Sequence, residues 1–78
     1  MNNIEEQYQE IKEKYQNKFR LKEDSSKSEF KYVIQFKSKE NNWLYMAFVP
    51  NNEAIDQEEY AKRYFIDYMR RIEKINKI

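Results

Sequence analysis

The apolar residues of this chain change their spacing twice, and this change limits the possible folds more than any other feature. Near the start they recur every three or four residues, which is the period of one face of an α-helix. These residues are Ile4, Tyr8, Ile11, Tyr15 and Phe19. In the middle they alternate with polar residues, which is the period of a β-strand with one buried face. The helical period returns after Asp56. The pattern predicts an α+β domain with a helix at each end.

The first helix is expected to run from about Asn3 to Lys18. Asn3 is suited to cap the first turn, with Glu6 three residues later as its capping-box partner. Glu5 and Glu6 near the start and Lys14 and Lys18 near the end complement the helix dipole. Local and periodic signals therefore agree on this helix.

The middle of the chain predicts strands. The segment Phe19–Lys22 alternates apolar and charged residues, which indicates a short edge strand guarded against aggregation by its cations. The polar residues 23–28 predict a loop. Two further strands follow, over Glu29–Lys37 and Trp43–Val49. The linker between them contains asparagines, which can take the left-handed conformation that a hairpin turn requires.

The second helix has a well-marked start. Pro50 ends the last strand because it has no N–H for the ladder, and Asp56 is the expected N-cap, with Glu59 as its capping-box partner. The helical period continues to about Asn76. Residues 1–78 therefore predict a single domain of order α-(β)-β-β-α, in which an N-terminal and a C-terminal helix pack on one face of a small antiparallel sheet of two to three strands.

This packing would leave the second face of the sheet open. Alternation assigns these residues to the helix side: Phe30, Ile34, Phe36, Leu44, Met46 and Phe48. It assigns these to the open side: Lys31, Val33, Lys37, Trp43, Tyr45, Ala47 and Val49. Aromatic rings beside lysines suit a hot spot of a protein interface, and they also suit stacking on nucleic-acid bases. Trp43 could equally pack on a loop or in a dimer interface.

The second helix carries another candidate surface, because Tyr60, Tyr64, Asp67 and Arg71 follow at helical spacing. Its simplest interpretation is structural, with Asp67 in an ion-pair ladder between Arg63 and Arg71. The candidate partner-binding residues taken from both surfaces are Lys31, Trp43, Tyr45, Tyr64 and Asp67.

Composition argues against most enzyme classes. The 78 residues contain no His, no Cys and no Gly. Thiol and imidazole nucleophiles and bases, and the usual ligands of zinc, haem and iron–sulfur clusters, are therefore missing. Glycine-rich phosphate loops cannot form either. We expect a non-catalytic protein without a cofactor or metal.

Charge and hydropathy limit the partners. The chain has 15 Lys and Arg against 14 Asp and Glu, so it lacks the overall basic footprint of a protein that binds duplex nucleic acid tightly. No run approaches the roughly 18 apolar residues of a membrane span, and the first residues are polar and acidic rather than basic and then apolar. These features lead us to expect a cytoplasmic protein without a membrane partner.

The preferred hypothesis is a small protein-binding module that acts by occluding a surface of a larger protein. Charge-rich, glycine-free domains of this size are typical of accessory and inhibitor proteins of phages and mobile elements, including anti-CRISPR proteins, and this analogy rests on size and composition. The alternative is a nucleic-acid-binding module that uses the aromatic and lysine face of the sheet. The element order is shared with double-stranded-RNA-binding domains, although the glycine-proline, histidine and double-lysine signatures of that family are absent. A homodimer is a third possibility.

Overall fold

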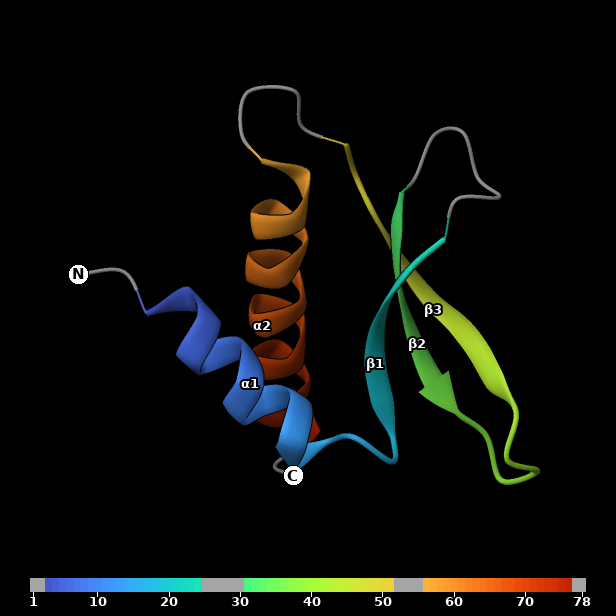
Figure 1. The fold of residues 1–78 in the computed structure, drawn as a ribbon. Helices are drawn as coiled ribbons and strands as arrows, with labels where there is room; N and C mark the ends of the chain where they lie inside the picture. The colour runs from blue at the N-terminus through green and yellow to red at the C-terminus, as the bar shows by residue number, and fades with distance from the viewer. Residues whose placement is uncertain (1–2, 25–30, 52–55, 77–78) are drawn as a thin grey trace.

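The computed structural model describes residues 3–24, 31–51 and 56–76. Its elements are α1 (Ile4–Lys14), β1 (Phe19–Glu23), β2 (Tyr32–Lys37), β3 (Trp43–Val49) and α2 (Gln57–Asn76). The strands form one antiparallel sheet in the order β1-β2-β3. Both helices lie against the same face of this sheet (Figure 1). The predicted α+β class is confirmed, and so is the short strand that begins at Phe19. Residues 25–28 of the predicted loop lie outside the described residues, as do Glu29 and Phe30 of the predicted second strand.

The start of α1 differs from the predicted capping box. The Asn3 carbonyl accepts a hydrogen bond from the Gln7 N–H at 2.9 Å, as an N-cap carbonyl does. The Asn3 side chain makes no capping hydrogen bond, so the predicted box with Glu6 is wrong.

The end of α1 comes four residues earlier than the spacing predicts. The helix ends at Lys14, and the Tyr15 carbonyl accepts hydrogen bonds from the N–H groups of Lys18 at 2.9 Å and Phe19 at 2.8 Å. These two bonds turn the chain directly into β1. Tyr15 and Phe19 still point toward the core although they follow the helix. The helical spacing of apolar residues therefore extends beyond the end of α1.

The turn between β2 and β3 depends on an asparagine, as predicted. Asn41 has φ of 66°, in the left-handed region that asparagine tolerates better than most residues. Its N–H donates to the Ser38 carbonyl at 3.0 Å, and the Ser38 N–H donates to the Asn42 carbonyl at 2.8 Å. Asn41 thus closes the hairpin in the place where a glycine would be usual.

Asp56 is the N-cap of α2, as predicted. Its carbonyl accepts from the Tyr60 N–H at 2.9 Å, and its carboxylate accepts from the Glu58 N–H at 3.4 Å. The Glu59 carboxylate pairs with Arg63 at 3.7 Å rather than with the N-cap, so the predicted capping box does not form. The helix runs to its predicted end.

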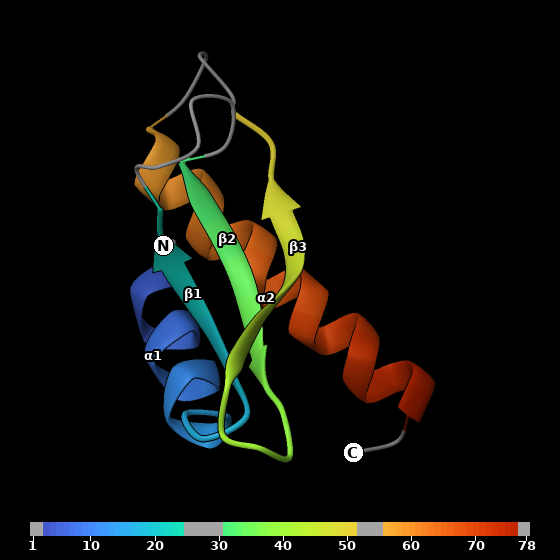
Figure 2. The same cartoon turned by 90° about the vertical axis from the view of Figure 1, so that its right-hand side faces the viewer.

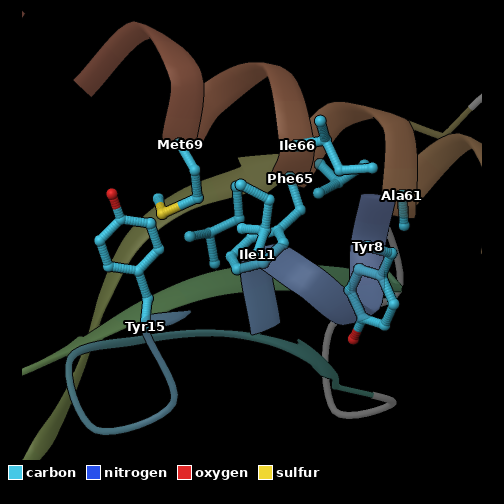
Figure 3. Close-up of a cluster of buried hydrophobic side chains, with 9 residues drawn as sticks. Tyr8, Ile11, Tyr15, Ala61, Phe65, Ile66 and Met69 are labelled. Atoms are coloured by element: carbon cyan, nitrogen blue, oxygen red, sulfur yellow. The ribbon is translucent and has the colours of Figure 1, made fainter. Parts of the chain in front are cut away.

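The core lies between the two helices and the inner face of the sheet. Its buried members are Tyr8, Ile11, Tyr15, Ile34, Val49, Ala61, Phe65, Ile66 and Met69. Figure 3 shows that those on the helices are directed toward one another, and the Tyr8 ring meets Phe65 edge-on at 5.9 Å between centroids. In Figure 2, α2 crosses behind the sheet and its C-terminal half extends past β3. No helix of the described residues lies over the opposite face of the sheet.

Polar contacts also join α1 to α2. Lys62 forms ion pairs with Glu5 and, at 3.5 Å, with Glu58, and its ammonium lies 5.3 Å from the centre of the Tyr8 ring. Near the other end of α2, Glu73 accepts from Lys14 at 2.7 Å and from the Tyr15 hydroxyl. One contact joins the starts of the two helices and the other joins their ends, and together they fix the orientation of α1 on α2.

Candidate interaction surface

A β-bulge decides which side chains of β3 lie on the face of the sheet away from the helices. Ile34 of β2 pairs with Ala47, whereas its neighbour Gln35 pairs with Tyr45. Met46 is the extra residue, and it has no partner on β2. One extra residue reverses the alternation of side chains in the rest of the strand.

The bulge overturns part of the predicted assignment of faces. Ala47 and Val49 turn inward, and Val49 is a fully buried core residue. Phe48 turns away from the helices and lies opposite Val33. The prediction was therefore wrong for these three residues of β3. Leu44 is on the helix side of the sheet as predicted, yet it remains 45% exposed.

We call the side of the sheet that faces away from α1 and α2 the outer face. Its described members are Arg20, Lys22, Val33, Gln35, Lys37, Trp43, Tyr45 and Phe48. Cross-strand pairing arranges them in rows, with Arg20, Gln35 and Tyr45 in one row and Lys37 beside Trp43. The outer face thus combines three cations with three aromatic rings. Trp43 and Tyr45 were predicted there with Val33 and Lys37, and these four predictions are confirmed.

Trp43 is held by two cations. The guanidinium carbon of Arg20 lies 4.1 Å from the ring centroid, and the Lys37 ammonium lies 5.6 Å from it. The Arg20 Nε donates to the Gln35 side-chain oxygen at 2.8 Å, and Gln35 is itself only 5% exposed. Stacked cations of this kind attract the ring face electrostatically. This arrangement fixes both the guanidinium and the indole.

Tyr45 and Phe48 form the second half of the outer face. Their ring centroids are 5.6 Å apart and their planes are inclined at 57°. The Tyr45 hydroxyl donates to Asp24 Oδ2 at 2.7 Å, and this hydrogen bond raises the pKa of the phenol. The two rings are 48% and 39% exposed, which is high for large apolar side chains in so small a domain.

The five predicted site residues do not form one site. Lys31 precedes β2 and pairs with Glu23 at 3.8 Å. Trp43 lies opposite Lys37, at the other end of β2, so roughly 20 Å of strand separates Lys31 from the Trp43 row. Only Trp43 and Tyr45 are neighbours on the outer face.

Tyr64 and Asp67 lie on α2, which is on the other side of the sheet. With Tyr68 and Arg71 they line a small pocket, and the Tyr64 ring is 6.5 Å from that of Tyr68. Among the described residues Asp67 forms no ion pair, and Arg63 pairs with Glu59 instead. The predicted ion-pair ladder is therefore wrong.

Four members of the outer face were missing from the prediction. Arg20 and Lys22 could have been found from the alternation that begins at Phe19, and Gln35 from its place between Val33 and Lys37 in the same alternating strand. Phe48 could not, since nothing in its neighbourhood in the sequence marks the bulge.

Comparison with known proteins adds no assignment, since no protein-family model, curated protein or solved structure matches the chain. Within residues 3–24, 31–51 and 56–76, no three acidic, His or Cys side chains come together as metal ligands. In the same residues, no helix combines the length and apolar character needed to cross a membrane. The chemistry of the outer face is therefore the basis for a functional proposal.

Proposed function

We propose that this chain is a non-catalytic protein-binding module that contacts a larger protein through its outer face. The observation that carries the proposal is the exposure of Tyr45 and Phe48 on a helix-free face whose third ring is Trp43. Trp, Tyr and Arg are the residue types most enriched in interface hot spots, and Arg20 adds the last of them. Fixed rings also lose little conformational entropy on binding.

The same geometry makes the nucleic-acid alternative less favourable. Stacking on bases requires open ring faces, yet the guanidinium of Arg20 already lies 4.1 Å from the centre of the Trp43 ring. Tyr45 and Phe48 meet at 57°, so they do not offer a common plane on which successive bases could stack. A protein surface, whose side chains vary in direction, fits such rings better.

The proposed mode of action is occlusion of a surface on the partner. This part follows the analogy with phage and mobile-element inhibitors, anti-CRISPR proteins among them, and its support is the size and composition of the chain. A cytoplasmic location belongs to the same proposal.

Photo-crosslinking tests the proposal. p-Benzoylphenylalanine replaces Tyr45 on the outer face or, as the control, Arg63 on the exposed side of α2, and each protein is irradiated in a lysate of its source cells. We expect a defined crosslinked protein from position 45, none from position 63, and a much weaker product when Trp43→Ala is added. No product from position 45, or equal products from both positions, would overturn the proposal.

A further inference from the structure

The cations of the described residues differ in how they are compensated. Among them, only Arg20, Lys37 and Lys62 are partly buried. Lys62 is neutralised by Glu5 and Glu58. Within residues 3–24, 31–51 and 56–76, neither Arg20 nor Lys37 has an ion pair. Partly burying a cation without a counter-charge is unfavourable, and here two such cations converge on one ring.

Arg20 is also oriented to receive an anion. Its Nε is used by Gln35, whereas no described residue accepts a hydrogen bond from its terminal nitrogens. The planar guanidinium donates in a fork that matches the two oxygens of a carboxylate. Because stacking on Trp43 and the bond to Gln35 already fix this fork, little ordering remains to be done when an anion arrives.

We propose that the partner places an acidic segment on this part of the outer face, with a carboxylate between Arg20 and Lys37 beside Trp43, and a neighbouring apolar side chain on Tyr45. This inference rests on the proposed function and names the chemistry of its partner. A carboxylate fits better than a nucleic-acid backbone, because only two uncompensated cations meet here and Asp24, bonded to Tyr45, adds a negative charge nearby. Tight binding to a polyphosphate needs more phosphate contacts than two cations provide.

The single tryptophan of the chain makes the test direct, since its fluorescence reports on the site itself. The purified protein is titrated at low salt with hexaglutamate and with hexaglutamine. We expect a saturable change in Trp43 emission with hexaglutamate alone, and weaker binding at moderate salt. A response to hexaglutamine as strong as that to hexaglutamate would overturn the inference.

Three variants locate the charge. Arg20→Gln and Lys37→Gln should each weaken hexaglutamate binding about tenfold or more, the loss expected for one charge-assisted contact. Lys74→Gln is the matched control, because Lys74 is an exposed cation of α2 on the other side of the sheet, and it should change binding by less than about threefold. Equal losses in all three variants would show a nonspecific charge effect and overturn the inference. Circular dichroism checks that each variant is folded. If Arg20→Gln does not fold, Lys37→Gln still tests the inference.

Two further measurements distinguish other occupants. Tighter binding of a ten-nucleotide oligouridine than of hexaglutamate would assign the face to nucleic acid. A dimer in sedimentation with a buried Trp43 would assign it to a second copy of the chain, and either result overturns the acidic segment. Crosslinking from position 45 without hexaglutamate binding would remove this inference and leave the proposed function in place. Hexaglutamate binding without a crosslinked protein would overturn the proposed function, and with it the protein as the source of the carboxylate, while it supports the carboxylate site beside Trp43.

Discussion

The rings of Tyr45 and Phe48 contact each other at 5.6 Å between centroids, although the two residues are three positions apart along one strand. In a regular strand such residues point to opposite faces of the sheet. The unpaired Met46 between them supplies the additional residue that brings both rings to the outer face. The bulge therefore builds the exposed aromatic pair and, in the same step, turns Val49 into the core.

Replacing Trp43 by Ala should separate binding from folding. Binding to the crosslinked partner should weaken by about 2 kcal/mol or more, the loss typical of a hot-spot tryptophan. The free energy of unfolding should fall by only about 1 kcal/mol, because the stacking of Arg20 and Lys37 is lost at a partly exposed position. Urea unfolding and an affinity measurement check the two effects. A variant that unfolds would instead make Trp43 a core residue.

Replacing Phe65 by Ala should be far more damaging. Phe65 is 1% exposed between α1 and the sheet, so the change leaves a cavity and should lower the free energy of unfolding by roughly 3–5 kcal/mol. Phe48→Ala removes the same group from the outer face and should cost roughly 1 kcal/mol. Urea unfolding followed by circular dichroism compares the two. Equal losses would contradict the inner and outer assignment of these rings.

Acid should weaken the contact between α1 and α2. Hydrogen bonds from Lys14 and then from the Tyr15 hydroxyl hold the pKa of Glu73 below its usual value of 4.5, and the charge of Arg70 acts in the same direction. A carboxylate with a depressed pKa contributes stability above its unfolded-state pKa, and that contribution is lost as the pH falls through the folded-state pKa. Glu73→Gln should therefore reduce the loss of stability below about pH 4.5.

Thermal unfolding between pH 7 and pH 3 measures this effect. Glu10→Gln, which changes an exposed carboxylate of α1, is the control and should keep the slope of the natural protein. If the Glu73→Gln variant loses as much thermal stability between pH 7 and pH 3 as the natural protein, Glu73 is not the source of this loss.

Replacing Asn41 in the hairpin turn by Ala or by Gly should have different effects on the free energy of unfolding. Asn41→Ala should lower the free energy of unfolding by roughly 1 kcal/mol, because alanine pays the steric penalty of the left-handed conformation. Asn41→Gly should be neutral or slightly stabilising, since glycine reaches this conformation without a penalty. Urea unfolding of both variants decides the point, and an alanine variant as stable as the glycine variant would contradict the positive φ.

The sequence predicts the elements of the fold well, because each depends on local signals. The apolar run from Trp43, ended by Pro50, identifies β3 with its observed bounds, and Asp56 marks the start of α2. The end of α1 was missed because Tyr15 and Phe19 continue the apolar spacing after the helix ends. Periodicity reports where side chains point, and it does not report where the backbone leaves the helix.

The candidate surface was harder to predict, because it depends on how strands pair. Trp43 and Tyr45 were found from alternation within their own strand. Arg20 reaches Trp43 only through the strand order β1-β2-β3, and Phe48 reaches the outer face only through the bulge. Strand order and the bulge both depend on how the strands pair, and short polar and apolar runs in the sequence do not determine this pairing.

The packing of α1 on α2 has a consequence for synthesis of the chain. Glu5 is separated from Lys62 by 57 residues and Lys14 from Glu73 by 59, whereas the three strands pair with their neighbours in the sequence. The strands can therefore pair early, but α1 has no helix to pack on until α2 has been made. At ribosomal rates this delay is roughly 3–12 s. During that interval the apolar stripe of α1 is unshielded on the nascent chain, so this helix is the last part of the core to be buried.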